Sequence, residues 1–331
     1  MLGNVTRVDA ASKQVIVDAD DKVGIRISYD YLIVATGATH SYFGHDEFAA
    51  FAPGLKSLSD AESLRNHLLE AFEKAEIEED PDRQKALMTF VMVGAGPTGV
   101  EMASAIAVMT QTTFRKDFRR IDPKSAHIVL VDMGSRPLAT FSEKLSEAAR
   151  RRLMSLGVDV RLGKPVQSID ADGVVIGEER IQTKSVVWTA GVVPSPAGKW
   201  LGCTVDRAGR VRTQPNLTVP DHPDIFVVGD TASLDQDGKP LPGVAQVAMQ
   251  QGRYAAKAIS RKVIGIRPCR RFVISIRGIW LLLARTSLCC RVPEFSSAAL
   301  SPGSCGLSYT FNSWQRVACG SAFLCNGAGP I

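Results

Sequence analysis

The stretch TFVMVGAGPTGVEMASAIAVM, from Thr89 to Met109, places an apolar run before a Gly-x-Gly-x-x-Gly turn and a helical pattern. This strand, turn and helix is the context in which the pattern indicates a dinucleotide site. Gly94 is predicted to form the tight turn, Gly96 to let the backbone approach a diphosphate, and Gly99 to let the helix pack closely on the strand. The amides at the helix start also favour an anion. The alternative is a glycine-rich turn that holds no ligand.

An acidic residue ends the next predicted strand, which runs from residue 126 to 131 and leads into Asp132. A carboxylate there can accept a hydrogen bond from the adenosine ribose 2′-hydroxyl, whereas a 2′-phosphate would meet a like charge. The connection from Gly99 is longer than usual, and Arg136 could accommodate a phosphate. The alternative role for Asp132 is a strand-end cap. The pattern predicts NADH rather than NADPH.

Strands and helices alternate along the middle of the chain, which is typical of a parallel sheet with crossover helices. The helix predicted over 59–77 places Leu64, Leu68, Leu69 and Phe72 on one face. Polar residues 76–85 are predicted to be a hinge. Further predicted elements are strands at 4–9, 14–18, 24–28 and 31–35, and helices at about 143–156 and 244–263.

The last part of the chain differs in composition from the rest. Of the 39 basic residues, seven arginines lie at or after Ile266 with one acidic residue, so the preceding 265 residues carry 32 basic and 33 acidic ones. Six of the seven cysteines also lie there, without C-x-x-C pairs or histidines, so no metal site is predicted. We expect residues 266–331 to be a disordered or out-of-frame extension. The alternative is a short disulfide-linked or membrane-contacting tail.

Three more segments place small and polar residues at strand ends. LIVATG ends on Thr36 and Gly37, VVWTAG ends on Gly191, and IFVVGDTA presents Gly229 and Asp230 after an apolar strand. The small residues of the first two segments would allow the chain to cross between domains close to a cofactor. The aspartate suits hydrogen bonding to a ribose or another polyol.

Two glutamines and a glutamate remain open to two interpretations. Gln246 and Gln250 lie one turn apart on the predicted C-terminal helix, which could equally be an ordinary packing helix rich in alanine. Glu101 lies in the first turns of the helix after the glycine turn. It is either favoured there by the helix dipole or directed toward the reacting end of the nucleotide.

Six segments together resemble the type II (alternative, non-proton-pumping) NADH:quinone oxidoreductases. They are YDYLIVATGATHSYFGHDEF, GAGPTGVE, RKDFRRIDPKSA, WTAGV, IFVVGDTA and AQVAMQQG. The resemblance runs from about residue 3 to 265. It implies an α/β flavoprotein with two dinucleotide-binding domains, in which a Rossmann-like NADH domain (53–191) is inserted in a partial FAD domain (1–52 and 192–265).

The resemblance also implies roles for individual residues. NADH would be held by Gly94, Gly96, Gly99 and Asp132, and FAD by Thr36, Gly37 and Asp230. Gly191 and Gly229 are also expected to bind a cofactor. Gln246 and Gln250 would line the quinone side of the flavin. Glu101 would lie near the nicotinamide and help to relay protons.

The implied reaction belongs to a respiratory chain. Hydride passes from NADH to FAD, and the electrons pass to a membrane quinone, either ubiquinone or menaquinone. Members of the family lie peripherally at the inner face of the cell membrane. Met1 leads into a strand-like stretch without the segments of a secretory signal, which favours a cytoplasmic location. A homodimer is left open, and no nucleic-acid partner is expected.

Two departures from the family pattern shape the expectations. The chain is expected to start past the family's first glycine-rich turn, which binds the FAD diphosphate, and its tail does not look amphipathic as the family's C-terminal helices do. An inactive, NADH-binding fragment is therefore one alternative. The other is a ferredoxin or disulfide reductase of the same superfamily.

Overall fold

The computed structural model describes residues 2–114, 117–267, 269–275, 279–283 and 286–290. The chain divides into two compact units. Unit 1 comprises residues 1–41 and 192–277, and unit 2 comprises residues 42–191 and 278–291. Sequence alone set the first boundary at residue 52. The structure sets it at Tyr42 because the Tyr42 and Phe48 rings pack on Trp188, at centroid distances of 5.0 and 6.0 Å.

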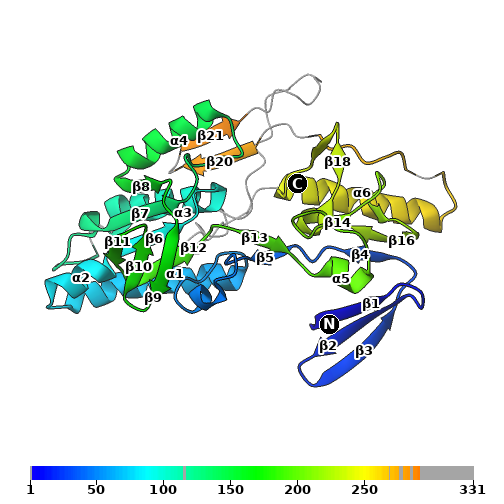
Figure 1. Cartoon of the computed structure of the whole chain (residues 1–331), viewed down its shortest axis with the longest axis horizontal. Helices are drawn as coiled ribbons and strands as arrows, with labels where there is room; N and C mark the ends of the chain where they lie inside the picture. Colours follow the sequence, from blue (N-terminus) through cyan, green and yellow to red (C-terminus); the bar gives the residue numbers. More distant parts are fainter. Residues whose placement is uncertain (1, 115–116, 268, 276–278, 284–285, 291–331) are drawn as a thin grey trace, which may run out of the picture. The chain divides into compact units, whose positions relative to one another are not determined.

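Unit 2 is built on a four-stranded parallel sheet in the order β12-β6-β7-β8. The strands are β6 (Thr89–Val93), β7 (His127–Asp132), β8 (Val158–Leu162) and β12 (Ser185–Trp188). Helix α3 (Pro97–Val108) connects β6 to β7, and α4 (Glu143–Ser155) connects β7 to β8 (Figure 1). The predicted α/β fold with crossover helices is thereby confirmed.

Strand β6 is buried at all five positions, so both faces of this sheet are covered. Phe90 and Met92 pack in the core on the side of helices α1, α3 and α4. Val91 and Val93 point to the opposite face and pack with an antiparallel sheet. That sheet consists of β9 (Val166–Asp170), β10 (Gly173–Ile176) and β11 (Glu179–Gln182). A continuous apolar strand is what burial on both faces requires.

Helix α1 (Leu58–Ile77) begins with a capping box in which the side chains of Ser57 and Asp60 bond each other's backbone amides. Its core face carries Leu64, Leu68 and Phe72, as predicted. Leu69 was wrongly placed on that face and is 39% exposed. A helix rotates by about 100° per residue, so the side chain that follows Leu68 turns out of the core.

The polar segment predicted to be a hinge lies inside unit 2, between α1 and α2 (Pro81–Leu87), and that prediction was wrong. The Gln84 side-chain amide donates to the Ala75 carbonyl across this connection, at 3.0 Å. The Glu76 carboxylate accepts backbone N–H groups of residues 119–121. Both contacts fix the segment within one unit.

Unit 1 contains an antiparallel meander of β1 (Asn4–Asp9), β2 (Gln14–Ala19) and β3 (Lys22–Ser28). A second sheet has the order β15-β16-β4, in which β4 (Leu32–Val34) runs parallel to β16 (His222–Val227) and antiparallel β15 is Thr218–Val219. A short ribbon pairs β5 (Ala38–His40) with β13 (Val192–Pro194). These two strands are the segments by which the chain leaves unit 1 and returns to it.

Helix α6 (Ala245–Val263) supplies much of the core of unit 1. Phe272 and Ile274 are buried in the same core, so packing continues past the composition change at residue 266. Strands β20 (Ile279–Leu283) and β21 (Thr286–Cys290) are assigned to unit 2. Residues 291–331, the larger part of the predicted atypical tail, lie outside the described residues. Within the described part of the chain, no helix has the length and apolar character needed to cross a membrane.

Candidate functional site

The glycine turn between β6 and α3 is constrained at its first and last glycines. Gly94 has φ +109, and a Cβ there would lie 2.4 Å from the Ala190 Cα. A Cβ on Gly99 would lie 1.9 Å from the Gly94 carbonyl oxygen. The Thr189 hydroxyl donates to the Gly94 carbonyl at 2.9 Å and was missed from the sequence. Neither glycine position therefore has room for a side chain.

The middle glycine is different, because a Cβ on Gly96 would meet no atom within 4 Å. Gly96 is also the N-cap residue of helix α3, and no side chain caps that end of the helix. The first amides of a helix have no partner within it, and its N-terminus carries partial positive charge. The turn therefore offers open space beside donors that suit a diphosphate.

Asp132 lies beside this turn at the end of β7. Its carboxylate accepts the backbone N–H of Ala95 and that of Gly134, each at 2.6 Å. The residue thus acts as a cap for two loops, which was the alternative role considered from sequence. Each carboxylate oxygen has a second lone pair, so hydrogen bonding to a ribose hydroxyl stays chemically open.

Arg136, which the sequence offered as a partner for a phosphate, bonds within its own loop. Its guanidinium donates to the carbonyls of Phe141 and Ala139, at 3.2 and 2.9 Å. The loop itself is joined to the glycine turn by the Leu138 N–H, which donates to the Ala95 carbonyl at 2.8 Å. The Arg136 guanidinium therefore donates its hydrogen bonds to carbonyls of its own loop in this structure.

Glu101 and Gly191 also lie in unit 2. Glu101 is half-buried in α3, just past its first turn, where the helix dipole is weaker than at the very end. Gly191 lies against an aromatic ring, because a Cβ there would come within 2.5 Å of the Phe43 ring. Gly191 thus leaves space for Phe43.

In unit 1, the ends of two parallel strands bring the other predicted residues to one sheet edge. Val34 of β4 is paired with Val227 of β16, and each strand is followed directly by a predicted motif. Thr36 and Gly37 follow β4, and Gly229 and Asp230 follow β16. The carboxyl ends of parallel strands are where ligands bind in open α/β sheets.

Three hydroxyl groups meet at this edge, two of which were missed from the sequence. The Thr36 hydroxyl is hydrogen-bonded to the Ser195 hydroxyl, and both lie 3.4 Å from the Thr231 hydroxyl. Thr231 is fully buried and donates to the Gly37 carbonyl at 2.9 Å, which also accepts the Ser195 N–H at 3.0 Å. This hydroxyl cluster (Thr36, Ser195 and Thr231) joins both motifs to the returning strand β13.

The glutamines of α6 occupy different environments. Gln250 exchanges two hydrogen bonds with the backbone of Ser275, at 3.0 and 3.1 Å, and so holds the segment after α6. Gln246 is half-buried near the start of the helix. Gln251, which the sequence analysis passed over, is buried and accepts the Gly229 N–H at 2.7 Å. Its spacing of four residues from both Val247 and Ala255, on one face of the helix, was the available signal.

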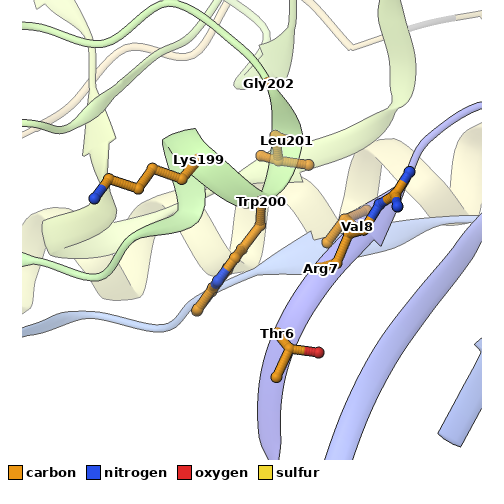
Figure 2. Close-up of a pocket in the computed structure, with 7 residues that line it drawn as sticks. All are labelled: Thr6, Arg7, Val8, Lys199, Trp200, Leu201 and Gly202. Atoms are coloured by element: carbon orange, nitrogen blue, oxygen red, sulfur yellow. The ribbon is translucent and has the colours of Figure 1, made fainter. Parts of the chain in front are cut away.

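A separate hollow of about 450 Å³ lies between β1 and α5 (Ala197–Leu201) of unit 1 (Figure 2). It is lined by Thr6, Arg7, Val8, Lys199, Trp200, Leu201 and Gly202. The charged ends of Arg7 and Lys199 point away from each other in Figure 2. They therefore do not converge on one anion, and none of the lining residues belongs to the motifs above.

Known proteins resemble this chain in both sequence and fold. The family model for pyridine nucleotide-disulphide oxidoreductases matches residues 1–252. The chain is 42% identical over 280 residues to the type II NADH:quinone oxidoreductase Ndh of Mycobacterium tuberculosis, covering 82% of this chain and 59% of that protein. It is 42% identical over 275 residues to NdhA of the same organism, covering 80% and 57%.

A solved structure of NDH2 from Plasmodium falciparum in complex with NADH matches with a TM-score of 0.78 at 16% identity. The match covers 89% of this chain and 76% of that one, and it supports the two-dinucleotide-binding flavoprotein fold. The chain spans under three fifths of the length of the two mycobacterial relatives.

Proposed function

Because the chain belongs to the pyridine nucleotide-disulphide oxidoreductase family, we propose that it is an NADH:quinone oxidoreductase of type II, with FAD and NADH as cofactors. The observation that carries the proposal is the glycine turn, which has an open middle position at an uncapped helix start beside Asp132. The 42% identity to two type II enzymes favours this reaction over those of ferredoxin or disulfide reductases.

NADH binding is assigned to unit 2. The amides at the start of α3 would receive the diphosphate over Gly96, where a side chain is absent and space is open. Asp132 would accept the ribose 2′-hydroxyl while keeping Ala95 and Gly134 in place. Its negative charge opposes a 2′-phosphate, so NADH is the proposed nucleotide.

FAD binding is assigned to the carboxyl edge of the β15-β16-β4 sheet in unit 1. Its donor and acceptor groups fit a polyol, because the Asp230 carboxylate and the hydroxyl cluster lie on adjacent strand ends. Bound FAD would supply the two-electron chemistry between NADH and quinone. The Asp230 carboxylate and the hydroxyl cluster would bind the hydroxyl groups of FAD and limit the access of water to them.

Three residues are proposed to act near the reacting groups. Glu101 would hold or pass a proton close to the nicotinamide, in keeping with its half-buried carboxylate one helical turn from the glycine turn. Gln246 would contact the quinone. Gln250 would fix the segment at Ser275 beside it, because both polar groups of its side chain are already bonded there.

Quinone as the electron acceptor implies a location. Ubiquinone and menaquinone are lipid-soluble, so we propose peripheral contact with the inner face of the cell membrane. A homodimer stays a prediction, as does the role of Gly191 near a bound cofactor.

The decisive experiment is to purify the full chain, add FAD and record the flavin absorbance spectrum, followed by titration with NADH. We expect stoichiometric flavin, bleaching by NADH under anaerobic conditions, and re-oxidation by a soluble quinone analogue. Ferredoxin and disulfide acceptors serve as comparisons. Preference for either of them would favour the other reductases, and a colourless chain that still binds NADH would support a nucleotide-binding fragment.

A further inference from the structure

A glutamine lies among the apolar residues on the buried face of helix α6. Gln251 is 1% exposed and follows Val247 by one turn, with Ala255 and Ala258 next on the same face. An amide buried among apolar side chains is costly unless it is hydrogen-bonded. The residue is therefore expected to serve a specific partner.

That partner is the backbone N–H of Gly229, which donates to the Gln251 side-chain oxygen at 2.7 Å. The sheet contacts of β16 end just before it, since the Val228 N–H is the last to reach β4, at the Val34 carbonyl. Gly229 then takes a left-handed conformation, with φ +74. Gln251 thus satisfies the first amide beyond the sheet, where the chain turns.

The turn carries Asp230, whose carboxylate lies against the chain at Gly243. A Cβ on Gly243 would come within 3.2 Å of an Asp230 carboxylate oxygen. On the other side, the Thr231 hydroxyl fixes the turn to the Gly37 carbonyl. Asp230 therefore lies between two residues whose positions are fixed by hydrogen bonds, Gly229 by Gln251 and Thr231 by the Gly37 carbonyl.

We propose that Gln251 is a positioning residue, which holds the Gly229–Asp230 turn so that the Asp230 carboxylate faces the hydroxyl groups of bound FAD. This rests on the proposed function for the FAD edge. Gln251 acts through Gly229 and itself needs no contact with the cofactor. It differs in this from Gln250, the adjacent glutamine, whose amide is bonded to Ser275.

The test compares Gln251→Met, which keeps the volume but removes the acceptor oxygen, with Gln251→Glu, which keeps an acceptor. Arg253→Met on the exposed side of α6 is the control. Hydrogen–deuterium exchange of peptides containing Gly229 is measured on the full chain without FAD, and FAD affinity by flavin fluorescence. We expect about tenfold faster exchange and about tenfold weaker FAD binding for Gln251→Met. Gln251→Glu should restore the slow exchange, and the control should match the wild type.

Unchanged exchange at Gly229 in Gln251→Met overturns the proposal. Faster exchange with unaltered FAD affinity overturns it as well, because the turn would then be irrelevant to the cofactor. If the wild-type chain binds no FAD, the proposed function is refuted, and so is the part of the inference that links Gln251 to FAD binding. If Gln251→Met does not fold, Gln251→Asn is used instead. Its side chain is one methylene shorter, so its amide oxygen lies farther from the Gly229 N–H, and the same results are expected.

Discussion

At the scale of single residues, the glycine turn of unit 2 contains one glycine that the fold requires, Gly99, and one that only ligand binding is expected to require, Gly96. Gly99→Ala would put a Cβ 1.9 Å from the Gly94 carbonyl oxygen, which belongs to the backbone and cannot rotate away. We expect a loss of roughly 2–4 kcal/mol in the free energy of unfolding, in the range of severe overpacking. Chemical denaturation of the full chain measures it.

Gly96→Ala is the matched substitution, because its Cβ enters open space. Stability should change by less than about 1 kcal/mol. NADH affinity should fall about tenfold or more, since the methyl group occupies the approach of the diphosphate. Titration by nucleotide fluorescence tests this, and equal NADH affinity in Gly96→Ala and wild type would argue against the site.

Nucleotide selectivity is also decided by single side chains. The wild type should bind NADH at least about tenfold more tightly than NADPH, because Asp132 opposes a 2′-phosphate. Arg136, which the sequence offered as a partner for a 2′-phosphate, is bonded to the Phe141 and Ala139 carbonyls. Parallel titrations with the two nucleotides measure the ratio, and equal affinities would contradict the role given to Asp132.

At the scale of elements, the antiparallel sheet β9-β10-β11 carries an ion pair that makes stability depend on pH. Arg180 forms two hydrogen bonds with Asp170, at 2.7 and 2.9 Å, and lowers the pKa of that carboxyl from 3.8 to about 2. Because the pKa of Asp170 is lower in the folded chain than in the unfolded chain, the charged carboxylate stabilises the fold at pH values above the unfolded pKa. This contribution is lost as the pH falls from about 4 toward 2. Asp170→Asn should therefore reduce the pH dependence of unfolding in that window.

The asparagine oxygen can still accept the Asp172 and Gly173 amides, so the substitution isolates the charge. Asp21→Asn, in an exposed turn of unit 1, is the control. The measurement is the melting temperature at several pH values between 2 and 6. Identical slopes for wild type and Asp170→Asn would show that the pair contributes nothing. Both side chains are nearly half exposed to solvent, so the effect should be small.

Helix α1 is joined to the loop before β7 by one carboxylate. Glu76 accepts the N–H groups of Arg119 and Arg120 at 2.9 Å and that of Ile121 at 3.1 Å. Glu76→Gln replaces one acceptor oxygen by a donor and leaves an amide without its partner. Trypsin cleavage after Arg119 and Arg120 should become about three- to tenfold faster. Glu73→Gln, exposed on the same helix, should digest like the wild type.

Sequence patterns predicted the elements better than the contacts that complete the sites. Strand β1 and the length of α6 follow from local periodicity and turn residues. The Thr36–Thr231 contact joins residues 195 positions apart, and Gln251 reaches Gly229 across 22. Such pairings depend on which strands become neighbours, which no local pattern contains. Leu69 shows the same limit within a helix, where hydrophobicity alone did not decide the face.

At the scale of the whole molecule, the chain passes from unit 1 to unit 2 after residue 41 and returns at residue 192, and strands β20 and β21 again belong to unit 2. Each unit has its own hydrophobic cores, and each proposed cofactor edge lies within one unit. Binding stabilises the structure that makes the contacts and slows its local opening. The two cofactors should therefore protect different parts of the chain from exchange.

Hydrogen–deuterium exchange of the full chain tests this separation. NADH alone should slow exchange in peptides spanning 89–101 and 130–138, which form the glycine turn and the loop after β7. FAD alone should slow exchange in 32–37 and 225–234, which form the edge in unit 1. Peptides of the β1-β2-β3 meander, which carries neither motif, are the internal reference. Protection of 32–37 by NADH without FAD would contradict the assignment, because the two nucleotide sites would then not be divided between the units.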